Sequence, residues 1–160
     1  MELNAHNKNE YPPMHTAEHI LNQTMIRMFG CKRSKNSHIE RKKSKCDYFL
    51  SSEPTAEQIA KIESEVNKVI AQTLTVSADF IPRNEVPETI DTSKLPADVS
   101  QTLRLVYVGD YDICACIGVH VQNTNEIGTF KILNCDFTEG RLRIRFKLED
   151  CPFIENVLAN

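Results

Sequence analysis

Two short segments of this 160-residue chain carry the residues best suited to bind a metal ion. His15 and His19 are separated by three residues, and Cys116 and His120 repeat that spacing later in the chain. Positions i and i+4 of a helix lie on one face, so histidines at this spacing can bind one ion. Three imidazoles and one thiolate suit a tetrahedral zinc ion. We therefore predict a zinc site formed by His15, His19, Cys116 and His120.

A second cysteine competes for the position of the sulfur ligand. Cys114 precedes Cys116 by two residues, so in an extended segment both side chains point to the same face. Only Cys116 is separated from His120 by three residues. We therefore predict Cys116 as the sulfur ligand, with Cys114 as the alternative. The start of the chain lacks the apolar stretch of an export signal, so we expect all six cysteines to be reduced thiols. The four others show no ligand-like spacing: Cys31, Cys46, Cys135 and Cys151.

The first segment also fits another metal chemistry. His15, Glu18 and His19 match the inverted metalloprotease pattern, in which the glutamate is the general base and a distant carboxylate is the third ligand. That hypothesis leaves Cys116 and His120 without a purpose.

The hydrophobic pattern of the chain predicts an α+β fold. An apolar stripe ending at Phe29 indicates a helix over 14–29, with Pro12-Pro13 before it and Gly30 to end it. A capping signal formed by Thr55 and Gln58 precedes a second amphipathic helix. Strands are expected over 46–50, 74–81, 103–108, 111–116, 129–137 and 142–148, with a tight hairpin at 138–140 and an irregular connection over 82–100. We predict one domain over residues 1–160, with an antiparallel sheet packed against two main helices.

Charge is distributed unevenly along the chain. The segment 32–45 contains seven basic residues and one acid, for a local net charge of +6, whereas the remainder carries −9. This cationic segment follows the predicted histidine helix, where it can hold a polyanion near a metal. We predict that it contacts RNA, the alternative being an unpatterned basic loop. The residues are Lys32, Arg33, Lys35, Arg41, Lys42, Lys43 and Lys45.

A second basic feature lies in residues 141–148, where charged and apolar residues alternate. As a strand, this segment has an apolar face and a basic face. The basic face could contact RNA. Alternatively, it is an ordinary solvent-exposed face whose charges prevent strand-to-strand aggregation.

Composition narrows the class of protein. With 41% hydrophobic and 26% charged residues, the chain has the profile of a soluble globular domain that forms its own core. No apolar run approaches the roughly 20 residues needed to span a bilayer. We expect a cytoplasmic protein.

Residues 15–21 (His-Thr-Ala-Glu-His-Ile-Leu) resemble the segment that opens the editing domains of alanyl-tRNA and threonyl-tRNA synthetases and their free-standing AlaX relatives. Residues 116–132 resemble the second motif of that family, in which Cys-x-x-x-His is followed by Thr-x-Glu-Ile-Gly and a strand. The resemblance extends in order and spacing from Met14 to Leu148. Because the sequence has no room for an aminoacylation core, the AlaX type is the nearest analogue.

The resemblance implies a zinc-dependent hydrolase that removes a wrong amino acid from tRNA in trans, with seryl-tRNA(Ala) as the expected substrate. Zinc can polarise an ester carbonyl or activate water, although four protein ligands make a closed site. Residues 117–119 are Ile-Gly-Val, whereas the fused alanyl enzymes usually have Gly-Gly-Thr between the cysteine and the histidine. Residues 34–37 are Ser-Lys-Asn-Ser, whereas those enzymes tend to have Gln-x-Gly-Ser in the connection after the first helix. These differences leave seryl-tRNA(Thr) as an alternative substrate. A non-catalytic, zinc-containing RNA-binding module is the alternative from another class.

Overall fold

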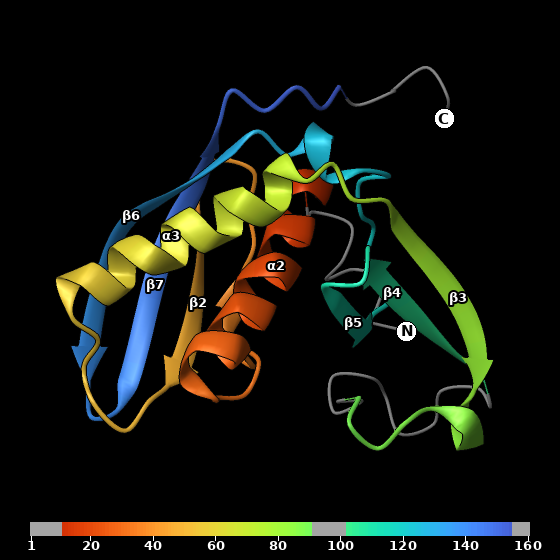
Figure 1. Ribbon diagram of the computed structural model, residues 1–160, viewed down its shortest axis with the longest axis horizontal. Helices are drawn as coiled ribbons and strands as arrows, with labels where there is room; N and C mark the ends of the chain where they lie inside the picture. Colours follow the sequence, from red (N-terminus) through yellow and green to blue (C-terminus); the bar gives the residue numbers. More distant parts are fainter. Residues whose placement is uncertain (1–10, 91–101, 155–160) are drawn as a thin grey trace.

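A computed structural model describes residues 11–90 and 102–154, which form two antiparallel sheets and two long helices (Figure 1). The α+β class is confirmed, but the strands divide between two sheets where the sequence pattern predicted one. The larger sheet has the order β1-β2-β7-β6 and the smaller one β3-β4-β5. The elements are α2 (Pro12–Phe29), β1 (Ser37–His38), β2 (Ser44–Phe49), α3 (Ala56–Ala71), β3 (Val76–Pro82), a 3-10 turn (Arg83–Glu85), β4 (Thr102–Val108), β5 (Asp112–Ala115), a second 3-10 turn η2 (Thr124–Glu126), β6 (Thr129–Thr138) and β7 (Arg141–Glu149).

Helix α2 begins two residues before the predicted start. Proline is tolerated in the first helical turn, because its missing N–H would have no intrahelical partner there. Gly30 ends the helix with a φ of 69°, and its N–H donates to the carbonyl of Ile26 at 2.8 Å. All residues from Pro13 to Asn22 are buried, so the turns that carry His15 and His19 lie inside the molecule.

Helix α3 has the predicted capping box. The Thr55 hydroxyl accepts the N–H of Gln58 at 3.1 Å, and the Gln58 side chain accepts the N–H of Thr55 at 2.8 Å. The helix then binds the edge of the larger sheet, because the side-chain amide of Asn67 bonds both the carbonyl and the N–H of Phe130. Helices α2 and α3 lie over the same face of that sheet, with α2 between it and the smaller sheet (Figure 1).

The predicted hairpin joins β6 to β7. Glu139 and Gly140 have φ values of 50° and 83°, as expected for a two-residue hairpin turn with both central residues in the left-handed region. Leu142, Ile144 and Phe146 of β7 point into the core, which confirms the alternating pattern of that strand.

The basic face of β7 is paired with carboxylates of neighbouring strands. Arg143 donates to both oxygens of Asp47 on β2, at 2.7 and 2.9 Å. Arg141 and Arg145 both contact Asp136 on β6, at 3.3 and 2.8 Å. This face is therefore an ion-pair network within the sheet.

The motif after the second ligand pair connects the two helices to the sheets. The Thr124 hydroxyl donates to the carbonyl of Ile70 and accepts the N–H of Leu74, each at 2.9 Å. Gly128 has a φ of 87°, and a side chain there would approach the carbonyl oxygen of Glu149 to 2.5 Å. The Thr-x-Glu-Ile-Gly segment thus fixes the fold next to the ligand loop.

The irregular connection predicted over 82–100 is described only as far as residue 90. Strand β3 extends to Pro82, and the 3-10 turn follows it. Residues 91–100 of that segment lie outside the described residues, as does His6. Among residues 11–90 and 102–154, no helix is long and apolar enough to cross a membrane.

Candidate metal centre

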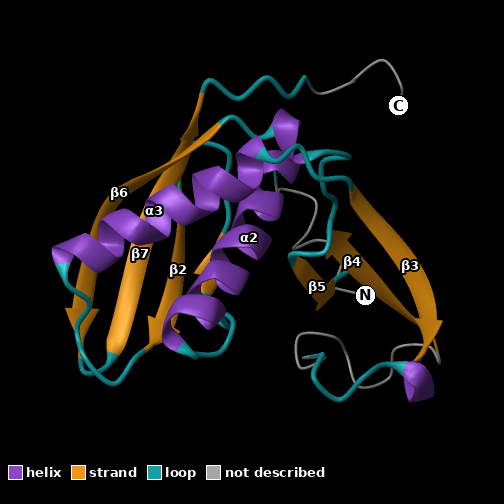
Figure 2. Cartoon of the chain, in the orientation of Figure 1, coloured by secondary structure: helices purple, strands orange, loops and turns teal. Residues whose placement is uncertain are grey.

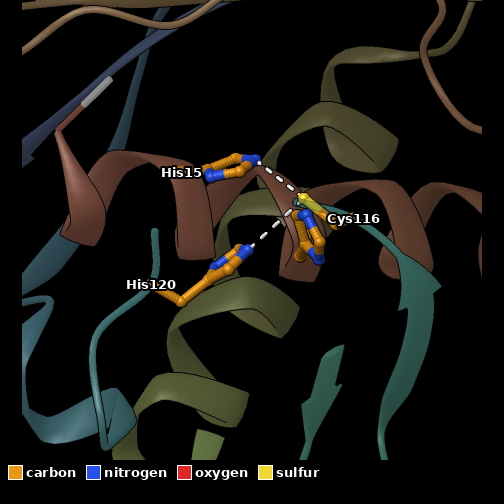
Figure 3. A group of neighbouring side chains, drawn as sticks. His15, Cys116 and His120 are labelled. Carbon is orange, nitrogen blue, oxygen red and sulfur yellow. Dashed lines mark hydrogen bonds between the residues drawn. The ribbon is translucent and has the colours of Figure 1, made fainter. Parts of the chain in front are cut away.

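The fold brings together the four predicted ligands from two distant segments. His15 and His19 lie in the first turns of α2, whereas Cys116 and His120 lie in the loop that follows β5 (Figure 2). One side-chain donor atom from each residue lies within 4.8 Å of all the others. His15 and His120 both point toward the sulfur of Cys116 (Figure 3). In the described part of the chain, this is the group of histidine, cysteine and acidic residues with geometry suited to a metal.

The distances within this cluster fit a tetrahedral ion. Cys116 Sγ lies 3.6 Å from His15 Nε2 and 3.7 Å from His120 Nε2. Zinc–sulfur and zinc–nitrogen bonds of ordinary length, placed at a tetrahedral angle, separate the sulfur and nitrogen donors by about 3.6 Å. The sulfur and these two nitrogens therefore have the spacing of donors to one tetrahedral ion, and all four donor atoms lie within 4.8 Å of one another.

Hydrogen bonds to the Nδ1 atoms fix the tautomers of two imidazoles. His15 Nδ1 donates to the carbonyl of Val119 at 3.2 Å. The Thr16 hydroxyl uses its one proton on the carbonyl of Pro12, so it accepts from His120 Nδ1, at 2.9 Å. Both rings thus carry the proton on Nδ1 and present the Nε2 lone pair to Cys116 and the cluster, as metal-binding histidines do.

A buried carboxylate lies beside the third imidazole. Asp112 Oδ2 is 3.7 Å from His19 Nδ1, and the side chain of Asp112 is fully buried. Arg33 donates to both carboxylate oxygens, at 2.7 and 3.0 Å, and Gln23 donates to Oδ1 at 2.9 Å. Burial alone would lower the pKa of Arg33, but the hydrogen bond and charge of Asp112 outweigh it and raise that pKa. The Asp112 side chain, held by Arg33, therefore lies next to His19.

The environment favours the neutral form of His120 and of Cys114. Burial, with smaller contributions from His15 and Arg104, holds the pKa of His120 well below its usual value. The imidazole is therefore neutral at pH 7, which is the form that binds metals. Burial raises the pKa of Cys114 to about 12, and Cys114 is not in the four-residue cluster. Geometry thus favours Cys116 over Cys114 as the sulfur ligand.

The ligand loop is held against the smaller sheet by one arginine. Arg104 Nη1 donates to the carbonyls of Cys116 and Gly118, at 3.0 and 2.8 Å. The N–H of Gly118 in turn donates to Cys116 Sγ at 3.4 Å. The loop is therefore shaped by its own backbone and by β4.

The seven basic residues of the segment 32–45 differ in their positions. Lys32, Lys35, Lys42 and Lys43 are exposed. Arg41 stacks on the ring of Tyr11, with its guanidinium carbon 4.4 Å from the ring centroid, and Lys45 is half-buried. Arg33 points inward to Asp112. Contact of these residues with RNA stays a prediction.

A hollow of about 650 Å³ lies between α2, the basic segment and the 88–90 loop. Gln23, Arg33 and Cys114 line it on the side of Asp112, Lys32 and Lys35 contribute cationic side chains, and Glu88 contributes a carboxylate. The hollow is large enough to hold a small ligand, and none of the four predicted metal ligands lines it.

The sequence pattern did not identify the residues around the cluster. Asp112, Arg33 and Arg104 act on the ligands only through contacts between segments far apart in sequence, and no spacing rule relates them to the histidines. Three polar side chains of α2 lie close to the histidines in sequence: Thr16, Asn22 and Gln23. All three side chains are bonded within the protein: Thr16 to His120, Asn22 to Tyr48 and Ser34, and Gln23 to Asp112.

Comparisons with known proteins relate this chain to aminoacyl-tRNA synthetases. Residues 103–145 match the family described as the threonyl and alanyl tRNA synthetase second additional domain. The alanine-tRNA ligase of Aeropyrum pernix is 32% identical over 157 residues, which is 94% of this chain and 17% of the ligase. The ligase of Ligilactobacillus salivarius is 34% identical over 84% of this chain and 15% of its own length. That of Methanococcus maripaludis is 27% identical over 99% of this chain and 19% of its own length. The chain thus spans less than a fifth of each of these relatives.

Proposed function

The chain is related to the alanine-tRNA ligases and resembles their editing domains and the AlaX proteins; from this premise we propose that it hydrolyses the ester bond of mischarged tRNA. The observation that carries the proposal is the convergence of His15, His19, Cys116 and His120 within 4.8 Å, in a segment that aligns with these ligases. The four residues belong to the two motifs that carry the resemblance, and their donor atoms lie together in the fold, which supports a functional site.

We propose that these four residues hold zinc. A bound zinc ion supplies positive charge that polarises the ester carbonyl or lowers the pKa of a nearby water. The residues around it keep the ligands in place: Thr16 and the carbonyl of Val119 orient two imidazoles, and Asp112 lies behind the third. Because four protein donors complete a tetrahedral shell, we assign no general base.

We place the aminoacyl end of the tRNA in this hollow, whose lining residue Cys114 precedes the predicted ligand Cys116 by two positions. The polar side chains of Gln23 and Arg33 face it, and Lys32 and Lys35 supply positive charge for the phosphates of the acceptor strand. Arg41, Lys42, Lys43 and Lys45 extend this charge along the same segment. Arg33 contributes through Asp112, since its guanidinium is engaged there.

Seryl-tRNA(Ala) is the substrate that we propose first, because the most extensive alignments are with alanine-tRNA ligases. An activation pocket for alanine rejects an added hydroxyl poorly, so a second hydrolytic site for serine is useful. Seryl-tRNA(Thr) is the alternative, since the matched family includes threonyl enzymes.

A deacylation assay with purified protein tests the proposal. The protein is incubated separately with seryl-tRNA(Ala), seryl-tRNA(Thr) and alanyl-tRNA(Ala), and loss of the amino acid is followed over time. We expect selective loss of serine, abolished in Cys116→Ser and retained in Cys114→Ser. Binding of tRNA with no deacylation by metal-loaded protein would instead support a non-catalytic RNA-binding module. Peptide cleavage that survives Cys116→Ala but not Glu18→Gln would support a protease.

A further inference from the structure

An exposed aromatic side chain lies on the same face of the smaller sheet as the ligand loop. Phe80 on β3 is 72% exposed, although phenylalanine is usually buried. Its position in the sheet is fixed by pairing with Arg104 on β4. Strand β3 is an edge strand of the β3-β4-β5 sheet, so no further strand among the described residues covers its outer side.

The pairing places Phe80, Arg104 and Cys116 in one row across the sheet. Val106 pairs with Cys114 and Leu105 with Ala115, so the next position along β4, Arg104, lies opposite Cys116. A hydrogen bond of 3.1 Å from the N–H of Cys116 to the carbonyl of Arg104 confirms this. Residues directly opposite on neighbouring strands share a face. Phe80 therefore lies on the face from which Cys116 reaches the histidines.

The middle of this row is cationic. Arg104 uses one nitrogen, Nη1, for both of its bonds to the ligand loop. A guanidinium has five N–H donors, so these two bonds leave donor capacity on the other nitrogens. An aromatic ring beside a fixed guanidinium is the combination that binds a nucleobase by stacking and its backbone by charge.

We propose that Phe80 is the stacking platform for the adenine of the 3′-terminal adenosine of the tRNA. This inference rests on the proposed function, because the ester that is hydrolysed lies on the ribose of that adenosine. Two strand spacings separate Phe80 from Cys116, a distance of about 10 Å along the sheet. A nucleoside whose base stacks on Phe80 can therefore extend across Arg104 toward Cys116. Its ribose then lies toward the four predicted metal ligands. The platform serves any tRNA, since all tRNAs end in this nucleotide.

The position of Phe80 favours a nucleobase over a protein partner. It is a single exposed ring, and its same-face neighbours on β3 are the small Ala78 and the rigid Pro82. One ring offers too little apolar area for a stable protein interface, which requires about 1,200 Å² or more in total. A base needs only the π-face of the ring, and we expect stacking of this kind to contribute roughly tenfold in affinity, about 1.4 kcal/mol.

Tryptophan fluorescence tests this directly, because the chain contains no tryptophan. Phe80→Trp introduces one reporter at the platform, and Phe49→Trp is the matched control, since Phe49 is 71% exposed but lies on the larger sheet. Both variants are titrated with uncharged tRNA ending in CCA and with the same tRNA lacking its terminal adenosine. We expect strong quenching of Phe80→Trp by the intact tRNA, weak quenching by the shortened tRNA, and no difference between the two tRNAs for Phe49→Trp.

Steady-state kinetics with mischarged tRNA provide a second readout. We expect Phe80→Ala to raise KM about tenfold with little change in kcat, and Phe80→Tyr to restore KM, because tyrosine keeps the stacking face. Adenosine 5′-monophosphate should inhibit the wild-type protein more strongly than Phe80→Ala.

The outcomes separate this inference from the proposed function. Quenching that depends on the terminal adenosine, in a protein that deacylates no tRNA, would support the platform and overturn the hydrolase. Active deacylation with equal quenching by both tRNAs and an unchanged KM in Phe80→Ala would overturn the platform alone. A change in oligomeric state of Phe80→Ala on sizing chromatography, with unchanged KM, would also overturn it and assign Phe80 to a contact between copies of the chain.

Discussion

Arg33 holds the buried carboxylate of Asp112 through two hydrogen bonds of 2.7 and 3.0 Å. Asp112 Oδ2 lies in turn 3.7 Å from His19 Nδ1, so one residue of the basic segment acts on the metal cluster through the protein interior. The basic segment is thereby connected to the four-residue cluster. A bound tRNA that moves this segment would also act on the support of His19.

Breaking this pair should destabilise the protein strongly. In Arg33→Ala, Asp112 remains as a buried charge without its main partner, and we expect the free energy of unfolding to fall by about 3 kcal/mol. Chemical denaturation measures the loss. Lys35→Ala is the matched control, because Lys35 is an exposed cation of the same segment. Equal stability of the two variants would show that the Arg33–Asp112 pair adds nothing to the fold.

The identity of the sulfur ligand can be tested by metal content. We expect Cys116→Ser and His15→Ala to reduce bound zinc below about one ion per chain, because each removes one of four ligands. Cys114→Ser should retain the metal, since the Cys114 thiol lies outside the cluster. Elemental analysis of the purified variants decides the point. Full zinc in Cys116→Ser together with loss in Cys114→Ser would reverse the assignment.

Thr16 should control metal affinity without binding the metal. Its hydroxyl accepts from His120 Nδ1 and from the N–H of Val121, at 2.9 and 3.2 Å. Thr16→Val removes this acceptor with little change in shape, and we expect zinc affinity to fall by about 10- to 100-fold, as for other groups that orient a ligand. Competition with a chelator measures the change. Thr16→Ser keeps the hydroxyl and should restore most of the affinity.

The exposed lysines of the basic segment should govern the salt dependence of tRNA binding. We expect Lys42→Ala combined with Lys43→Ala to weaken binding and to reduce the slope of log affinity against log salt by roughly 1.5, because each phosphate contact releases counterions. Binding is measured at several salt concentrations. A Lys61→Ala variant on the exposed side of α3 should leave the slope unchanged. An unaltered slope in the double variant would remove these residues from the interface.

Asp47 should contribute stability that depends on acid pH. The hydrogen bond from Arg143 lowers the pKa of the buried Asp47 carboxyl, helped by the bond from Asn36 and opposed by burial. A carboxyl with a lowered pKa in the folded state stabilises the protein above its unfolded pKa of about 3.9 and loses that contribution as the pH falls further. We expect the difference in unfolding free energy between wild type and Asp47→Asn to be largest near neutral pH and to shrink below about pH 4. Denaturation at a series of pH values measures it, and a constant difference would contradict the ion pair.

The sequence by itself determined the features that depend on local order. The helix around His15 and His19, the capping box at Thr55, and the hairpin at Gly140 follow from periodicity and from residues with restricted or permissive backbones. The spacing of His15 with His19, and of Cys116 with His120, selected four residues whose donor atoms the structure places within 4.8 Å. Local chemistry was enough for the helix, the capping box, the hairpin and the two spacings, because each involves residues close in sequence, whereas the fold brings the two pairs together.

Tertiary structure alone decided which charges face inward and how the strands divide between sheets. Nothing in the segment 32–45 distinguishes Arg33 from its neighbours until Asp112, 79 residues away, is placed beside it. The same holds for Asp47 and Asp136, which pair with the basic side chains of β7, and for Arg104, which reaches the ligand loop. Burial of a charge depends on which segment packs against it, and this packing is a property of the whole fold that sequence spacing does not contain.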